Sequence, residues 1–387
     1  MNPLIDLPAQ SKLPRVKTTI FAVMSALAAK HGALNLSQGF PDFSCPHALM
    51  DAVTRAMQAG HNQYAPMTGI PALREQIAVR VKAMYGAEVD VDQDITVTAG
   101  ATEALFVAIQ ACVRAGDEVI VFDPAYDSYE PAVELAGGRC VHLPLAAPDY
   151  RIDFDRLADA INPRTRLIII NSPHNPSGSM LESADLDALE QLVANTGIML
   201  ISDEVYEHIV FDGREHQSIL RRPALAERSF VISSFGKTYH TTGWKIGYCI
   251  APKGLSAEFR KIHQYVTFCV ATPLQHATAE FMASSDHHLE LPAFYQAKRD
   301  RFRGALVDSA WQLLPCSGTY FQLLGYSAFD NRADTDMADW LTREVGVAAI
   351  PISVFNADGR DERILRFCFA KDDATLDAAT EKLAALG

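Results

Sequence analysis

Long apolar runs, paired cysteines and an excess of basic residues are all missing from this chain of 387 residues. Only Ile20–Ala29 comes near the ~18 apolar residues of a membrane span, and its spacing fits one face of an N-terminal helix. The seven cysteines include no Cys-x-x-Cys pair, so we expect reduced thiols, a cytoplasmic protein and no bound metal. A formal charge of −13 argues against a nucleic-acid partner.

Repeats, low-complexity segments and long linkers are also absent, which favours a globular chain of one large domain or two domains. Its residues are 49% hydrophobic and 21% charged, enough for a sizeable core. Between residues 95 and 233, continuous apolar strands alternate with helices, which indicates a mostly parallel sheet covered on both faces. From about residue 288, a long helix expected over Leu289–Ala310 and shorter strands indicate a smaller α+β domain.

The predicted fold class is therefore α/β with a second, smaller α+β domain. We expect residues 1–45 to form an N-terminal segment that packs with the small domain. Residues 46–287 would form the large domain and residues 288–387 the small C-terminal domain. The strands expected in the large sheet are Ile95–Thr98, Glu118–Phe122, 139–143, Leu167–Ile170, Ile198–Ser202 and Phe230–Ser233.

A lysine stands in a turn of small residues between two apolar strands, Phe230–Ser233 and Ile246–Ile250. Lys237 in such a rigid turn is well placed to form a Schiff base with a carbonyl group. The hydroxyl of Ser234 and the cation of Lys245 could hold a phosphate beside it. A surface lysine in a turn is the alternative for Lys237 taken alone.

Polar residues follow the expected strands, and ligands bind at the carboxyl ends of the strands in open α/β sheets. Asp203 directly follows a fully apolar strand, so its burial calls for a cation, which a protonated pyridine nitrogen would supply. Asn175, in the run Asn171–Gly178, could donate a hydrogen bond to a phenolate oxygen, and Tyr206 could reach the same atom. A helix N-cap or an ion pair is the structural alternative for Asp203.

Three further segments carry weaker signals. Residues 99–103 enter a helix whose N-terminus could approach a phosphate, or they form an ordinary tight connection. Tyr126 could stack on a planar ring or fill the core. Arg366 lies inside an apolar strand, where its guanidinium could bind an α-carboxylate or an internal acidic side chain.

Taken together, these residues make the chain resemble the class I aminotransferases of fold type I, which depend on pyridoxal 5′-phosphate (PLP). The resemblance runs from Asn35 to the C-terminal helix and is strongest at Asn171–Gly178, Asp203–Tyr206, Ser234–Gly247 and Arg366. Within that family, Gly236–Lys245 and Asn35–Phe43 look like the subgroup of kynurenine–oxoglutarate and glutamine–phenylpyruvate transaminases. Many members have arginine where Lys245 stands, so we expect a single-point phosphate contact here.

The resemblance implies an enzyme that moves the amino group of methionine, and of aromatic amino acids or glutamine, to a 2-oxo acid. A carbon–sulfur β-lyase acting on cysteine conjugates is the alternative that keeps the cofactor. A PLP-binding transcription regulator is disfavoured. Such proteins need an N-terminal helix-turn-helix domain of ~60 or more residues, whereas 34 residues precede Asn35 here.

The resemblance also implies roles for single residues. Lys237 would form the internal aldimine and move protons, Asp203 would hold the ring N–H, and Tyr206 would complete the catalytic set. The other contacts to PLP would come from Gly100, Ala101, Thr102, Tyr126, Asn175, Ser234, Lys245 and, across a homodimer interface, Tyr64. The substrate would be held by Gly39, Arg366, Asn175, Phe21, Phe40 and Phe268.

Overall fold

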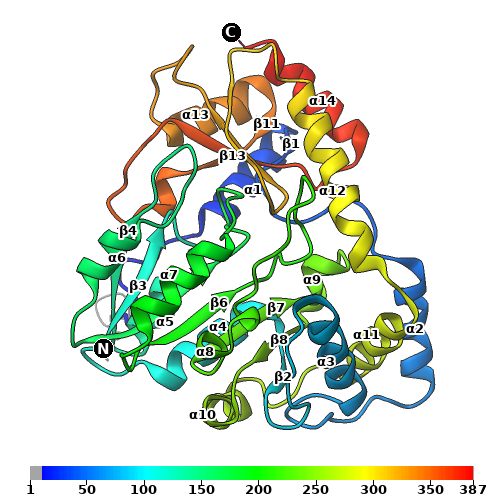
Figure 1. Ribbon diagram of the computed structural model, residues 1–387. Helices are drawn as coiled ribbons and strands as arrows, with labels where there is room; N and C mark the ends of the chain where they lie inside the picture. Colours follow the sequence, from blue (N-terminus) through cyan, green and yellow to red (C-terminus); the bar gives the residue numbers. More distant parts are fainter. Residues whose placement is uncertain (1–10, 387) are drawn as a thin grey trace, which may run out of the picture.

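The computed structural model describes residues 11–386. The largest of the sheets in this range has seven strands (Figure 1). The strands are β2 (Ile95–Thr98), β3 (Glu118–Asp123), β4 (Arg139–Pro144), β5 (Thr165–Asn171), β6 (Met199–Asp203), β7 (Ser229–Ser234) and β8 (Gly247–Ile250). Their order across the sheet is β2-β8-β7-β6-β5-β3-β4. β8 runs antiparallel to β2 and β7, and the other pairs are parallel, so the predicted mostly parallel α/β sheet is confirmed.

Both faces of this sheet are buried, because successive side chains of a strand point to opposite faces. In β5, Leu167 and Ile169 join one apolar cluster, whereas Ile168 and Ile170 join the other. A strand covered in this way must be apolar throughout, which is why the uncharged runs predicted it. The helices of this part are α2 (His47–Gln58), α3 (Pro71–Tyr85), α4 (Gly100–Cys112), α5 (Tyr129–Leu135), α6 (Phe154–Ala160), α7 (Ser183–Val193), α8 (Pro223–Ala226), α9 (Phe235–Thr238), α10 (Lys253–Val266) and α11 (Thr272–Ser284).

The C-terminal part holds a second, antiparallel sheet of the order β12-β13-β10-β9. Its strands are β9 (Gln312–Leu313), β10 (Phe321–Gly325), β12 (Ile350–Pro351) and β13 (Ile364–Cys368), with helices α12 (His287–Gly304), α13 (Asp334–Trp340) and α14 (Asp373–Ala384). In Figure 1, α12 and α14 lie beside each other above the large sheet.

The N-terminal segment lies against this C-terminal part. Helix α1 (Ile20–His31) leads into β1 (Leu34–Asn35), which pairs in parallel with β11 (Val347–Ala348). The first ten residues of the predicted N-terminal segment, and Gly387, lie outside the described residues. The domain limits stay a prediction.

Two local predictions were wrong. Lys237 is not at the tip of a turn but in the single helical turn α9. The long helix ends at Gly304 instead of Ala310, because glycine is a poor helix former and residues 305–310 fold into turns. Farther along, α13 continues at Leu341 into a π-helical turn, which ends at Gly346 with a φ of 79°.

Candidate active site

The carboxyl edge of the large sheet brings the predicted polar residues side by side. Asn171, the last residue of β5, lies opposite Asp203, the last residue of β6. Ser234, the last residue of β7, lies opposite Gly247, the first residue of β8. Because β8 is antiparallel, its amino end shares this edge, and Lys245 just before it arrives at the same place.

A pocket of about 230 Å³ opens at this edge. Three basic side chains and one acidic side chain line it: Lys237, Lys245, Arg366 and Asp203. In a chain with a net charge of −13, this local excess of positive charge favours an anionic ligand. The other lining residues are Phe21, Gln38, Gly39, Ala101, Thr102, Leu105, Tyr126, Asn171, Asn175, Val205, Tyr206, Ser234, Thr242 and Phe321.

Lys237 extends from α9 and donates hydrogen bonds to the carbonyl oxygen of Gly39 at 3.2 Å and to the hydroxyl of Tyr320 at 2.8 Å. Burial lowers the pKa of Lys237 to about 8, and the positive charges of Arg366 and Lys245 act in the same direction. An amine with this pKa is neutral, and so nucleophilic, in a useful fraction of molecules near pH 7.

Asp203 is only 3% exposed at the floor of the pocket. The hydroxyl of Tyr129 donates a 2.7 Å hydrogen bond to its Oδ2 atom. Burial raises the pKa of Asp203 to about 6. A carboxylate in this position therefore gains from a cationic partner in the pocket.

The start of α4 and Lys245 form the second polar end of the pocket. The methyl side chain of the N-cap residue, Ala99, cannot accept hydrogen bonds from the first backbone N–H groups of the helix. These donors are therefore available to an anion. Lys245 adopts a left-handed backbone with a φ of 54°. A side chain on Gly100 would place its Cβ 3.0 Å from the Nζ atom of Lys245, so glycine permits this close approach.

Arg366 comes from the middle of β13 and is 1% exposed. Its Nη1 atom donates to the side-chain oxygen of Asn175 at 2.8 Å, and Nη2 donates to the carbonyl oxygen of Ser37 at 3.1 Å. Its Nε atom has no hydrogen-bond partner among the described residues. No acidic side chain pairs with it within 4.0 Å there, so the guanidinium can receive a carboxylate from outside.

Most of the predicted site residues line the pocket, and four do not. Gly100 lies beneath Lys245, outside the lining. Phe40 is 45% exposed on the surface. Tyr64 is 82% exposed, and its ring contacts that of Phe268 edge to face at 5.2 Å; neither residue is among those that line the pocket. The roles predicted for all these residues stay predictions.

Several pocket residues were missed. Gln38, Asn171 and Thr242 lie inside the motifs noted above, which was the available signal. Phe321, the first residue of β10 in the other sheet, belongs to a segment in which no ligand motif was noted. Within residues 11–386, no group of three His, Cys, Asp or Glu side chains is placed to hold a metal ion. No helix in the same range is long and apolar enough to cross a membrane.

The chain belongs to the aminotransferases of class I and II, whose family model matches residues 32–383. It is 54% identical over 383 residues to the methionine aminotransferase of Escherichia coli, an alignment that covers 99% of this chain and 98% of that protein. The solved structure of YbdL from Escherichia coli, identified as having a methionine aminotransferase function, matches with a TM-score of 0.96 and covers 97% of this chain and 99% of that one. Human kynurenine–oxoglutarate transaminase 1 is 33% identical over 392 residues, 92% of this chain and 93% of that protein. The predicted family and fold type are thus confirmed.

Proposed function

We propose that this aminotransferase uses PLP and takes methionine as its preferred amino donor, with aromatic amino acids or glutamine as further donors and a 2-oxo acid as acceptor. The observation that carries the proposal is the meeting of Lys237, Asp203 and Arg366 in one positively charged pocket with aromatic walls. The Escherichia coli relative named above supports methionine in particular. A cytoplasmic location stays a prediction.

The residues of the pocket fit PLP. Its phosphate suits the uncapped start of α4 with Ala101, Thr102, Ser234 and Lys245 around it. The buried carboxylate of Asp203 suits the protonated ring nitrogen, and Lys237 suits the aldehyde. The ring would lie against Tyr126, with Asn175 and Tyr206 near its phenolic oxygen.

PLP, when bound, supplies an electron-withdrawing ring that accepts the electron pair of the substrate's Cα–H bond. Asp203 would keep the ring nitrogen protonated, because a buried carboxylate is stabilised by a positive charge beside it. Lys237, with its lowered pKa, takes a proton at its Nζ atom and can return it elsewhere on the substrate. The net reaction exchanges the amino group of one substrate for the oxo group of another.

Arg366 would bind the substrate's α-carboxylate through its free N–H. Asn175 and the Ser37 carbonyl hold its other nitrogens, and the ring of Phe321 lies 3.9 Å from its guanidinium carbon. Because every amino acid has an α-carboxylate, this contact aligns the substrate without selecting it. Selection falls to the walls of the pocket, which Phe21 and Phe321 help to form.

We expect kcat/KM for methionine to exceed that for aspartate by at least ~100-fold. Methionine can place its polarizable thioether against the aromatic walls, at about 0.3–1.5 kcal/mol per contact. Aspartate would have to bury a second carboxylate, and within residues 11–386 Arg366 is the only arginine that lines the pocket. The measurement is the rate at which each amino acid converts the bound cofactor in the first half-reaction.

Norleucine, which has the length of methionine and no sulfur, is the matched control and should react within about tenfold of methionine. Equal rates for methionine and aspartate would contradict the apolar pocket and leave the family assignment intact. Release of pyruvate from a cysteine conjugate without any 2-oxo acid would instead favour the β-lyase alternative.

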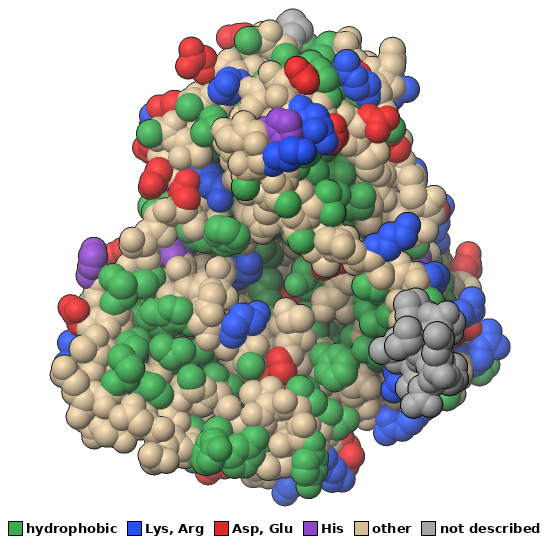
Figure 2. All heavy atoms as spheres, turned by 180° about the vertical axis from the view of Figure 1, so that it is seen from behind, with side chains coloured by type: hydrophobic (Ala, Val, Ile, Leu, Met, Phe, Trp, Pro, Cys, Tyr) green, Lys and Arg blue, Asp and Glu red, His purple; other side chains and the backbone are tan. Residues whose placement is uncertain are grey.

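An exposed aromatic patch supports a homodimer. Tyr64, Tyr265, Val266 and Phe268 are all exposed although apolar, and the hydroxyl of Thr272 binds the Gln63 carbonyl oxygen to hold the two segments together. Figure 2 shows hydrophobic side chains gathered over the lower half of one face of the molecule. Apolar surface of this kind is typical of an interface, and the position predicted for Tyr64 needs a second subunit.

A mixture of inactive Tyr64→Ala and Lys237→Ala variants should therefore regain activity. Each mixed dimer would contain one site with neither substitution, so up to about one quarter of wild-type activity is expected after random exchange of subunits. Size-exclusion chromatography with light scattering would establish the dimer, and mixing under exchange conditions would measure the recovery. A fully active monomer would disprove the shared site.

A further inference from the structure

Tyr320 does not line the pocket but contacts Lys237, which does. Its hydroxyl accepts the 2.8 Å hydrogen bond from the Nζ atom of Lys237 and donates its own proton to the carbonyl oxygen of Gly39. Lys237 Nζ also donates to that carbonyl at 3.2 Å. Three polar groups from three distant segments of the chain thus form one closed set of hydrogen bonds.

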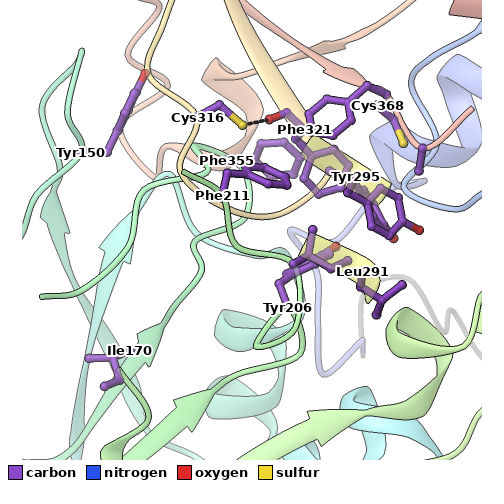
Figure 3. Close-up of a cluster of buried hydrophobic side chains, with 14 of the residues drawn as sticks. Tyr150, Ile170, Tyr206, Phe211, Leu291, Tyr295, Cys316, Phe321, Phe355 and Cys368 are labelled. Atoms are coloured by element: carbon purple, nitrogen blue, oxygen red, sulfur yellow. Dashed lines mark hydrogen bonds between the residues drawn. The ribbon is translucent and has the colours of Figure 1, made fainter. Parts of the chain in front are cut away.

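The position of Tyr320 is held from every side. The residue is completely buried, and its ring contacts Tyr206 edge to face at 5.2 Å, Tyr295 at 5.7 Å and Phe321 at 4.9 Å. Figure 3 shows Tyr206, Tyr295 and Phe321 converging from separate elements between the two parts of the molecule. The hydroxyl of Tyr320 therefore has little freedom to move, so the hydrogen bond forms where the flexible side chain of Lys237 reaches it.

We propose that Tyr320 is a positioning residue that binds the amine of Lys237 whenever that amine is free and keeps it beside the Gly39 carbonyl at the pocket. The inference rests on the proposed function, in which Lys237 alternates between a bound and a free amine.

These hydrogen bonds fix the direction of the lone pair on the Nζ atom of Lys237. A neutral amine has two N–H groups and one lone pair. The oxygens of Tyr320 and Gly39 accept the two N–H groups, so the lone pair points away from both and stays available to take a proton. Because Tyr320 gives its own proton to Gly39, it cannot donate to the lysine and mask that lone pair.

The test measures Lys237 directly, without transamination. Full-length protein freed of cofactor is treated with acetaldehyde and cyanoborohydride between pH 6 and 10, and the alkylation rate at Lys237 is followed by mass spectrometry. The midpoint of the wild-type rate profile should lie near pH 8. In Tyr320→Phe the midpoint should fall by about 1 pH unit, because the protonated amine loses a hydrogen-bond acceptor.

Tyr295→Phe is the matched control, since Tyr295 packs on Tyr320 but its hydroxyl has no partner among the described residues. Its midpoint should match that of the wild type. An unchanged midpoint in folded Tyr320→Phe, or equal shifts in both variants, would overturn the inference. Tyr320→Met provides the same loss of the hydroxyl if circular dichroism shows Tyr320→Phe to be unfolded. A wild-type Lys237 that does not react would overturn the proposed function and this inference with it.

Discussion

Lys237→Ala should lower kcat/KM by at least ~10⁴-fold. The substitution removes both the nucleophile for the cofactor's aldehyde and the base that moves the substrate's proton. No other lysine can take over, because the other lysine of the pocket, Lys245, lies by the start of α4 at the opposite polar end. The measurement is steady-state transamination of methionine, together with the visible absorbance of the protein after addition of PLP.

Two controls separate chemistry from folding. Lys261→Ala changes an exposed lysine, paired with Glu258 on α10, and should leave both the activity and the absorbance unchanged. Lys237→Arg keeps a positive charge in the pocket but should be as inactive as Lys237→Ala, because guanidinium stays protonated and does not condense with the aldehyde. Substantial activity in either Lys237 variant would refute the role proposed for this residue.

Asp203→Asn should lower kcat by ~10²–10³-fold while the protein still binds PLP. An amide of nearly the same shape can accept the hydrogen bond from Tyr129, but it cannot keep the ring nitrogen protonated. The electron-withdrawing power of the ring then falls, whereas the contacts to the phosphate are unaffected. Single-turnover rates with methionine, measured at saturating PLP, test this. Near-normal turnover would leave Asp203 with a structural role alone.

The same variant has an expected effect on stability, with a sign set by the raised pKa of Asp203. In the unfolded chain the carboxyl has its ordinary pKa, 3.8, whereas in the folded protein the pKa is about 6. Its proton therefore stabilises the fold fully below about pH 4, and this stabilisation is lost as the pH rises through about 6. In protein without cofactor, Asp203→Asn should therefore become more stable relative to the wild type between pH 4 and pH 6, by up to about 3 kcal/mol in unfolding free energy. Urea unfolding at several pH values measures this difference, and a difference that does not change with pH would contradict it.

The elements of the large sheet were predictable because they follow from local patterns. The central strands β3, β5, β6 and β7 each contain an uninterrupted apolar run, since both faces of the sheet are covered there, and this pattern is visible without knowing any partner strand. The rule that ligands bind at carboxyl ends then selected Asn175, Asp203 and Lys237, which all line the pocket. Arg366 was selected because it interrupts an apolar strand, and the family resemblance supplied the more distant Gly39; both line the pocket too.

By itself, then, the sequence determined the class of fold, the family and the polar residues at the ends of the strands, because periodicity and motifs are properties of neighbouring residues. Only the tertiary structure decided that β8 runs antiparallel, and that Tyr320 from the second part of the molecule touches Lys237. It also decided that Phe40 and the contacting pair Tyr64 and Phe268 lie outside the pocket of their own chain. Such pairings depend on how separate segments of the chain pack against one another, and the pattern of neighbouring residues within one segment does not record which segment it will meet.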